Sequence, residues 1–417
     1  MNSFFTPKAP LSEPADALLA DIAIRVQLSP TQYSLAEQRY DTVHKWIERP
    51  GSPLEDRVLQ FHTQGSMAIG ATVASKLQYD EHDIDLIAEL DIPANTAPSA
   101  VLDLLESAIR GERGSRYYSM VKRHSRCIQI AYEGMHLDIT PMVRLAHLPE
   151  RCGYIYHAPN EHASPEDRML LANPWGFARW FTQNTPAEQR FALAFAERAS
   201  GFEGAITLAE AEVEPVPAQV AAHEKSMAVI SLQLLKRFRN VQYDQREGRC
   251  PPSVMLSYFV ARHANQTQTL SEEVLHQSRM LRDVFQAHQR AGQLVEVRNP
   301  KCNDDIFTDR WPANLTQQGL FLRDLDRLVE RLEEYCGECT LVRMQQILTE
   351  LFGDRPALDV VKAFNEHMGR SIVDGRSRHV PERGRFVLPT AASVAAAAIP
   401  AVGRATPRHT HFGGRTK

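Results

Sequence analysis

Hydrophobic and polar positions divide the chain into a mixed first half and a helical second half. Residues 15–48 repeat apolar side chains with a helical period, which Ser29 and Pro30 interrupt. Strand-like alternation follows over 58–139 and is broken by one helical stretch at 98–113. The first half is therefore predicted to contain leading helices and then a small sheet with one covering helix.

Helical periods dominate after Trp175. They recur at 176–200, 223–240, 253–263, 270–291, 316–335, 340–353 and 357–369. An aperiodic polar loop at 295–312 separates two of these helices, and residues 201–222 form a connector rich in Glu, Pro and Ala. We therefore expect an α+β protein with two lobes. Its predicted parts are a helical lead-in at 1–50, a mixed-sheet palm at 51–165, a helical lobe at 166–375 and a tail at 376–417.

Composition is that of an ordinary globular protein. Of 417 residues, 43% are hydrophobic and 24% are charged. The net charge of −4 does not indicate stable nucleic-acid binding, and the six scattered cysteines do not form a disulfide framework. No apolar run reaches the length of a membrane span, and the N-terminus lacks a signal-peptide pattern. We expect a cytoplasmic protein with no membrane association.

The tail at 376–417 differs from the rest of the chain. It contains eight Lys or Arg residues and one Glu, so that it carries +7 within a chain of net charge −4. Residues Ala391 to Ala401 are low in complexity. This composition predicts a segment that is disordered or that depends on a partner.

Three aspartates carry the first candidate chemistry. Asp83 and Asp85 alternate with apolar residues, which places both on one face of a predicted strand. Asp138 lies in the return strand of a predicted hairpin and joins them if the strands are neighbours. Three carboxylates can bind two Mg²⁺ ions, which is the arrangement that nucleotidyl transfer uses. A solvated acidic edge is the alternative, although an unpaired Asp among apolar strand residues is costly.

A Gly-Ser pair carries the second candidate chemistry. A predicted strand from Val58 to Gln64 runs into Gly65 and Ser66, and a predicted helix or turn follows from Met67 to Leu77. Backbone N–H groups and a hydroxyl in such a turn can bind phosphates, and Gly permits a close approach. Most Gly-Ser pairs are simple turns, but an Asp-x-Asp seventeen residues after Ser66 makes the combination more specific. We expect the three residues to bind a nucleotide.

Together these motifs resemble those of the DNA polymerase β-like nucleotidyltransferase superfamily. They are more closely similar to the bacterial cGAS/DncV-like nucleotidyltransferases (CD-NTases, or SMODS synthases) of CBASS anti-phage systems. The matching segments are Gly65-Ser66 with Gly70-Ala71-Thr72, then His82 to Leu86, then His136 to Pro141. Ala71 interrupts the usual Gly-Thr of the family. The resemblance covers about residues 15–375 and leaves the tail outside.

The resemblance implies a two-lobed fold and an anti-phage signalling synthase. Such an enzyme joins NTPs, ATP among them, into a cyclic di- or trinucleotide and releases pyrophosphate. It also implies that Asp83, Asp85 and Asp138 are the catalytic residues and the ligands of two Mg²⁺ ions, with Mn²⁺ as the alternative metal. Gln64, Gly65 and Ser66 are then the palm residues that bind the donor nucleotide.

Two residues of the helical half extend the resemblance, since the family uses a Lys and a Ser on successive helices to hold the triphosphate. Lys236 lies about 160° from the apolar stripe of its helix, so that it can face a cleft. That stripe consists of Met227, Ile230, Leu234 and Phe238. Ser253 begins the next helix, where the helix dipole favours phosphate. Without the resemblance, Lys236 is a solvated lysine and Ser253 an N-cap.

Other functions remain open. The same superfamily includes polynucleotide and tRNA nucleotidyltransferases, as well as enzymes that modify proteins or small molecules. A non-catalytic scaffold that senses nucleotides could use the fold too, although the presence of all three carboxylates argues against it. Cyclic products that resist phosphatase distinguish a cyclase from a polymerase, which makes a ladder of products.

Two short features concern zinc and partners. Cys336 and Cys339 have the spacing of half a zinc site, but no second such pair exists, so we expect free cysteines rather than structural zinc. In the resembled family, C-terminal tails engage HORMA-type regulators or ubiquitin-like conjugation machinery. This tail ends in Arg415, Thr416 and Lys417 rather than in a small residue, which argues against conjugation.

Overall fold

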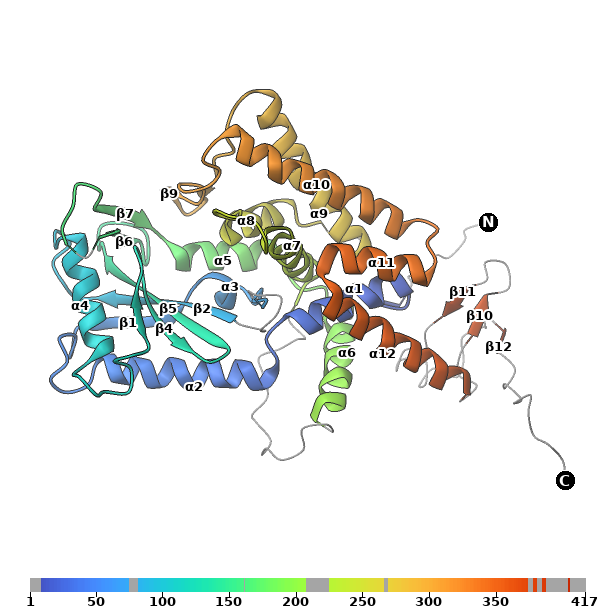
Figure 1. Ribbon diagram of the computed structural model, residues 1–417, viewed down its shortest axis with the longest axis horizontal. Coiled ribbons are helices and arrows are strands. Elements are labelled where there is room, and N and C mark those ends of the chain that lie inside the picture. Colours follow the sequence, from blue (N-terminus) through green and yellow to red (C-terminus); the bar gives the residue numbers. More distant parts are fainter. Residues whose placement is uncertain are drawn as a thin grey trace.

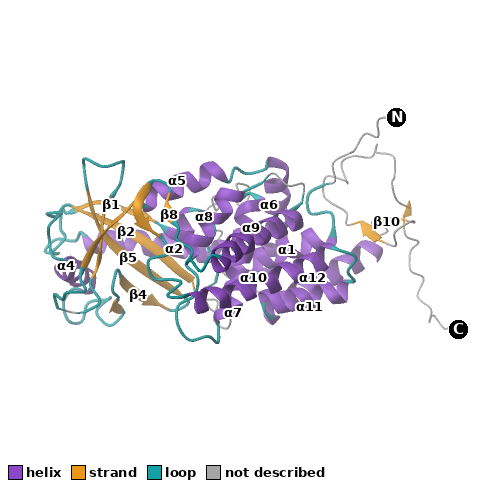
Figure 2. Ribbon diagram, turned by 90° about the horizontal axis from the view of Figure 1, so that it is seen from above, coloured by secondary structure: helices purple, strands orange, loops and turns teal. Residues whose placement is uncertain are grey.

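The protein has two lobes, which lie at opposite ends of its long axis (Figure 1). The computed structural model describes residues 9–74, 82–160, 162–207, 225–265, 269–373, 378–380, 385–387 and 404–405. Strands gather in the palm and most helices in the second lobe, as the view from above also shows (Figure 2). This arrangement confirms the predicted two-lobed α+β architecture.

A seven-stranded sheet forms the palm. Five strands follow the order β1-β2-β5-β4-β3, while β6 pairs with both β5 and β7. The strands are β1 (Val58–Thr63), β2 (His82–Leu90), β3 (Val121–Arg123), β4 (Ile128–Tyr132), β5 (Met135–Arg144), β6 (Gly153–His157) and β7 (Arg168–Ala172). Strands β2 and β5 run parallel, and the other neighbouring pairs of this sheet run antiparallel. Strands β6 and β7 were not predicted.

Two helices cover the palm sheet, α2 (Pro30–Ile47) and α4 (Pro98–Arg110). Ile84 and Leu86 of β2 are fully buried in the palm core, whereas Asp83 and Asp85, which alternate with them, are only half-buried. The period-two pattern of β2 therefore places its apolar side chains in the core and its carboxylates on the opposite face. A short helix, α3 (Gly65–Ala68), follows β1 directly.

The second lobe is built around α7 (Met227–Tyr243). Its other helices are α1 (Pro14–Val26), α5 (Pro174–Asn184), α6 (Gln189–Thr207), α8 (Ser253–His263), α9 (Leu270–Arg290), α10 (Leu315–Cys336), α11 (Leu341–Phe352) and α12 (Asp354–Val373). Every residue of α7 from Met227 to Arg239 is buried. The predicted apolar stripe of this helix is buried, but so is its opposite side, because α7 packs against other helices and also against the loop at 71–74.

The N-terminal segment contributes to both lobes. Ser29 begins α2 with a capping box, in which its Oγ accepts a hydrogen bond from Gln32 N (3.2 Å) and Gln32 Oε1 accepts one from Ser29 N (2.9 Å). This cap separates α1 from α2. Leu18 of α1 is buried in the core of the helical lobe, whereas Val43 of α2 is buried in the palm core.

The predicted aperiodic loop at 295–312 contains a short hairpin, β8 (Arg298–Asn299) and β9 (Cys302–Ile306). Strand β9 lies against β7 of the palm. The amide of Asn299 donates to the carbonyl of Asn173 at the junction between the lobes (2.9 Å). The sulfur of Cys302 lies 3.7 Å from that of Cys152 in the palm. Strands this short depend on contacts with distant residues, so alternation along the sequence does not reveal them.

Parts of the predicted connector and tail lie outside the described residues. These parts are residues 208–224 and most of the tail. The predicted helix or turn from Met67 to Leu77 also lies outside the described residues beyond Ala74. Within the tail, the described strands β10 (Arg378–Val380), β11 (Arg385–Val387) and β12 (Arg404–Ala405) pair in the order β11-β10-β12. Among the helices of the described chain, none is both long and apolar enough to cross a membrane.

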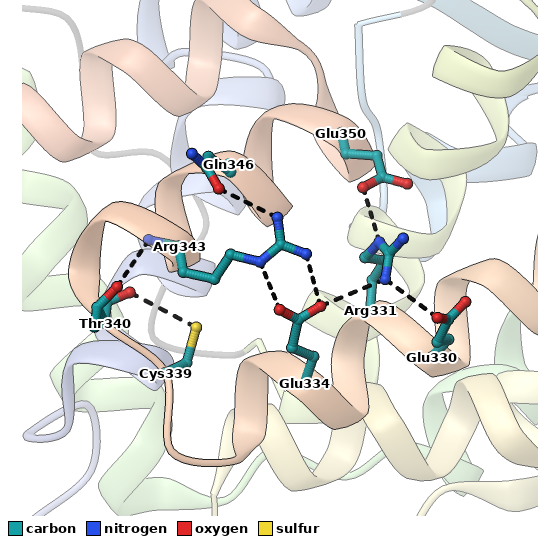
Figure 3. A network of polar contacts seen from close by, with 8 residues as sticks. All are labelled: Glu330, Arg331, Glu334, Cys339, Thr340, Arg343, Gln346 and Glu350. Carbon is teal, nitrogen blue, oxygen red and sulfur yellow. Dashed lines mark hydrogen bonds and ion pairs between the residues drawn. The ribbon is translucent and has the colours of Figure 1, made fainter.

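Cys336 and Cys339 lie at the turn between α10 and α11. Figure 3 shows this region, where Glu334 binds both Arg331 and Arg343 and links the two helices. The sulfur of Cys339 donates to the carbonyl of Thr340 (3.6 Å). The sulfur of Cys336 is used elsewhere, since it donates to the carbonyl of Ser271 (3.8 Å). Both thiols thus have local protein acceptors.

Candidate active site

Strand register brings the three aspartates together. In the parallel pair of β2 and β5, Asp85 lies directly opposite Asp138, and Asp83 lies opposite His136. Because side chains alternate along each strand, all three carboxylates project from the same face of the sheet. The expectation that the two strands are neighbours is thus confirmed. Gln129 of β4 donates from Nε2 to Oδ1 of Asp138 (3.0 Å), which fixes one side of that carboxylate.

Electrostatics at this site disfavour three negative charges. Burial raises the pKa of Asp85 to about 7, and the carboxylates of Asp138 and Asp83 act in the same direction. Lys236 opposes them. A carboxyl group that lies among like charges in a desolvated place gains most from a bound cation.

The Gly-Ser turn packs directly onto Asp85. The backbone N–H of Gln64 donates to the carbonyl of Asp85 (2.8 Å). Gly65 has a φ of +57°, and a Cβ added there would lie 2.4 Å from Oδ2 of Asp85. Only glycine fits this position, because a side chain would be strained and would strike the carboxylate. Ser66 follows in the first turn of α3 and is half-buried.

Gln64 has a structural place in this turn. Its side-chain amide donates to Oγ1 of Thr140 (3.3 Å) and to the carbonyl of Leu86 (3.4 Å). These bonds hold the end of β1 against β2 and β5. Both contacts of the Gln64 amide group are made within the protein. They support a structural role for Gln64 and do not test its predicted role in nucleotide binding.

Helix α7 reaches the loop that follows the Gly-Ser turn. Three side chains on one side of α7 donate to consecutive parts of this loop. They are Gln233 Nε2 to the carbonyl of Thr72 (3.0 Å), Lys236 Nζ to that of Ala71 (2.7 Å) and Asn240 Nδ2 to that of Ala74 (3.2 Å). The second lobe thereby fixes the position of the loop relative to the palm.

Lys236 is only 4% exposed, so it does not face an open cleft as predicted. Burial lowers its pKa to about 7, Arg239 acts in the same direction, and the negative charges of Asp85 and Asp83 oppose the shift. The ammonium thus lies within the electrostatic range of the carboxylates, although it belongs to the other lobe.

Ser253 is the first residue of α8, and the N-cap is Pro252, which makes no side-chain cap bond. Ser253 is therefore not the N-cap that the sequence alone suggested. Its Oγ accepts a hydrogen bond from Nη1 of Arg239 (2.8 Å). Arg239 lies on α7 one turn after Lys236, and sequence reasoning did not identify it. An arginine near a helix end resembles a solvated side chain unless the packing is known.

A second group of residues connects the lobes near the aspartates. Arg126 of the palm forms an ion pair with Asp309, which follows the β8–β9 hairpin. Arg126 Nε also lies 3.4 Å from Nδ1 of His157. Burial lowers the pKa of the neighbouring Arg310, and Arg126 contributes to this shift. Sequence reasoning noted the polar loop that contains Asp309 and Arg310, but it did not predict the pairing with Arg126, which comes about only through the fold.

The donor set fits a hard divalent cation. Carboxylate oxygens on neighbouring strands are the ligands that Mg²⁺ prefers, and substrate phosphates usually complete its shell. In the part of the chain that the structure describes, no three His, Cys, Asp or Glu side chains are already closed around a metal position. The chemistry of these residues suits the predicted metal.

Comparisons with known proteins show the family of this chain. Residues 15–184 match the family model of the Second Messenger Oligonucleotide or Dinucleotide Synthetase (SMODS) domain. The chain is 40% identical over 411 residues to the cyclic dinucleotide synthase CdnG of Bradyrhizobium diazoefficiens, which covers 98% of this chain and 97% of that protein. It is 23% identical over 364 residues to the c-di-GMP synthase of Roseivirga ehrenbergii, covering 86% of this chain and 89% of that protein.

Solved structures show the same fold. The structure of the Bradyrhizobium CdnG in complex with GTP matches with a TM-score of 0.75 and 42% identity, and covers 85% of this chain and 99% of that one. The Escherichia coli CdnC structure with ATP matches with a TM-score of 0.52 at 12% identity, over 81% of this chain and 97% of that one, which shows the likeness of fold. The sequence, the fold and the aspartate register agree, and the chain belongs to the CD-NTase family of nucleotidyltransferases, the second-messenger synthases.

Proposed function

We propose that this protein joins two NTPs into a cyclic dinucleotide and releases two pyrophosphates. The observation that carries the proposal is the convergence of Asp83, Asp85 and Asp138 on one face of the sheet, next to the Gly-Ser turn. The synthases to which the chain is similar are named for dinucleotide products, which supports a ring of two nucleotides rather than three. GTP is a proposed substrate, since the CdnG relative was solved with it. ATP remains a second proposed substrate.

The carboxylates and the triphosphate site have separate roles in this proposal. Asp83, Asp85 and Asp138 would hold two Mg²⁺ ions, or Mn²⁺, and these ions would supply positive charge to the attacking and leaving oxygens. The backbone of Gly65 and the hydroxyl of Ser66 would bind the donor phosphates from the palm. Lys236 and Ser253 would bind them from the helical lobe. An acceptor ribose hydroxyl then attacks the donor α-phosphorus, and pyrophosphate leaves.

A second round on the linear intermediate closes the ring. The terminal hydroxyl of the intermediate attacks the α-phosphorus of its own triphosphate, and a second pyrophosphate leaves. The position of the Gly-Ser turn above Asp85 supports this scheme, since it keeps triphosphate and carboxylates adjacent. A polynucleotide or tRNA nucleotidyltransferase is the competing function, and it would give extended linear products. A nucleotide-sensing scaffold would give none.

Removal of divalent metal tests the metal part of the proposal. Excess EDTA should stop pyrophosphate release from mixed NTPs, because the carboxylates alone cannot neutralise the developing charge. Added Mg²⁺ or Mn²⁺ in excess of EDTA should restore it, and Ca²⁺ serves as the control for a divalent ion of different geometry. Pyrophosphate is measured by a coupled assay. Full release in EDTA would contradict the proposed metal requirement.

The pH dependence of substrate binding tests Lys236. Its pKa is lowered to about 7, so the ammonium loses its proton as the pH rises through that value. The KM for NTP should therefore be about tenfold or more higher at pH 8.5 than at pH 6.5, in keeping with one proton taken up on binding. Lys236→Met should raise KM at pH 6.5 and remove this difference. The exposed Lys301→Met is the control and should keep it. If KM depended on pH in Lys236→Met as it does in wild type, the proposed role of Lys236 in binding the triphosphate would be contradicted.

The cellular setting is also a proposal. Family membership supports a role in CBASS anti-phage signalling in the cytoplasm. The Escherichia coli CdnC, which shares the fold, was solved with a HORMA protein. A HORMA-type regulator that acts on the tail is accordingly proposed here, and ubiquitin-like conjugation machinery is the alternative that the last residues of the tail disfavour. Deletion of residues 387–417 with no change in activity or in captured partners would remove the tail from that role.

A further inference from the structure

Arg239 is a buried cation whose hydrogen-bond acceptors are all uncharged. The residue is 7% exposed. Its guanidinium donates to the carbonyl of Pro251 (2.8 Å), to Oγ of Ser253 (2.8 Å) and twice to Oδ1 of Asn240 (3.1 and 2.7 Å). Among the residues that the structure describes, no carboxylate pairs with it. A buried charge without a counter-charge is costly, so this position requires an explanation.

Two partly buried arginines in the same lobe have carboxylate partners. Arg246 binds both oxygens of the buried Asp324 (2.5 and 2.8 Å). Arg198 forms a bidentate ion pair with Asp21. The lobe thus compensates these guanidinium charges internally. Arg239 differs from them because no carboxylate of the described residues compensates its charge. A bound anion would supply the missing negative charge.

The place of Arg239 indicates which group that is. It lies three residues after Lys236 on α7, and so on the same side of the helix. Its bond to Ser253 occupies a lone pair of the hydroxyl oxygen, which leaves the O–H of Ser253 as a donor. Its bonds to Asn240 fix the side chain that holds the carbonyl of Ala74, in the loop after the Gly-Ser turn. Arg239 therefore contacts Ser253, to which donor-phosphate binding has been attributed, and through Asn240 it also supports the loop that follows the Gly-Ser turn.

We infer that Arg239 is a positioning residue for the donor triphosphate, which it serves by holding Ser253 as a hydroxyl donor and by a buried charge that the triphosphate balances. This inference rests on the proposed triphosphate site of Lys236 and Ser253. The ligand class is a polyphosphate anion, and the nucleoside part is not involved. The competing explanation is structural, because Arg239 also joins α7 to the start of α8 through Pro251.

Arg237 provides a matched control on the same helix. It is 4% exposed and donates from Nε to the carbonyl of Phe352 at the end of α11 (3.0 Å). It therefore joins α7 to α11, whereas Arg239 joins α7 to the start of α8. Arg237→Met should lower the Tm of the free protein without weakening polyphosphate binding. Arg239→Met should weaken polyphosphate binding whatever its effect on the Tm of the free protein.

The experiment measures the gain in Tm on addition of inorganic tripolyphosphate, together with KM and kcat for NTP. We expect wild type and Arg237→Met to show the gain and Arg239→Met to lose it. In Arg239→Met, KM should rise about tenfold or more while kcat changes by less than about threefold. Arg239→Lys, which keeps the charge but not the fork, should recover part of the KM.

A structural role alone predicts the opposite result. The inference is overturned if Arg239→Met lowers the Tm of the free protein but keeps the wild-type gain and KM, or if wild type shows no gain with tripolyphosphate. Suppose that tripolyphosphate raises the Tm of wild type but not of Arg239→Met, and that wild type makes no cyclic product. That result would support the inference and refute the proposed synthase activity. Cyclic product with an unchanged KM in Arg239→Met would refute the inference and leave the synthase intact.

Discussion

Asp85→Asn is expected to abolish product formation, with turnover reduced by about 1,000-fold or more. Asp85 lies opposite Asp138 in the register of β2 and β5, and Gly65 packs against its carboxylate. An amide is nearly isosteric but carries no negative charge, so it cannot hold a divalent cation together with Asp83 and Asp138. The loss should appear mainly in kcat, because the proposed triphosphate contacts come from other residues.

The fold of Asp85→Asn should remain intact. Burial and two neighbouring carboxylates raise the pKa of Asp85 to about 7, so a neutral side chain relieves repulsion in the metal-free protein. We expect an unchanged or higher Tm in EDTA at neutral pH. Asp91→Asn, at an exposed aspartate directly after β2, is the control and should keep full turnover. Pyrophosphate release and cyclic product at wild-type rates in Asp85→Asn would contradict the assignment.

Gly65→Ala should have the second largest effect, a fall in kcat of about 100-fold or more. The added Cβ would lie 2.4 Å from Oδ2 of Asp85, at a φ of +57°. Relief of this clash must move either the Gly-Ser turn or the carboxylate, and small displacements of reacting groups can cost about 100-fold in rate. Circular dichroism should show retained secondary structure, since Gly65 is exposed and lies outside both cores.

The control for backbone strain is Gly134→Ala. Gly134 has a φ of +70°, and a Cβ there would meet nothing within 4 Å. It lies in the turn between β4 and β5, away from the Gly-Ser turn. Both substitutions place alanine in the left-handed region and should cost similar stability, about 1 kcal/mol. Only Gly65→Ala should lose turnover. An equal loss in both variants would show that strain, rather than contact with Asp85, is responsible.

Local patterns in the sequence were sufficient for the centre of the site. The alternation around Asp83 and Asp85 predicts which face they share, and the hairpin turn before Asp138 predicts a returning strand. The parallel pairing of β2 with β5 supplies the remaining step, and it requires the fold. The contact between Gly65 and Asp85 could not be read from the sequence, because it depends on how β1 ends beside β2.

Residues of the helical lobe were harder to predict. Lys236 was expected to face a cleft because one side of α7 was read as polar, but that side is covered by the loop at 71–74, and helices from distant parts of the chain cover the rest. Arg239 resembled a solvated arginine for the same reason. The β8–β9 hairpin is too short to show alternation, and it is stabilised by contacts at the lobe junction. In each case the missing information is tertiary packing, which overrides local propensity.

Identification of the product is the most direct test of the central claim, that both lobes together form a cyclic dinucleotide synthase. The purified protein is incubated with the four NTPs and Mg²⁺, and the products are treated with phosphatase and analysed by mass spectrometry. We predict a phosphatase-resistant product with the mass of two nucleotides closed in a ring, two pyrophosphates for each ring, and neither in Asp85→Asn. A ladder of linear products, or no product with all four NTPs, would contradict the claim.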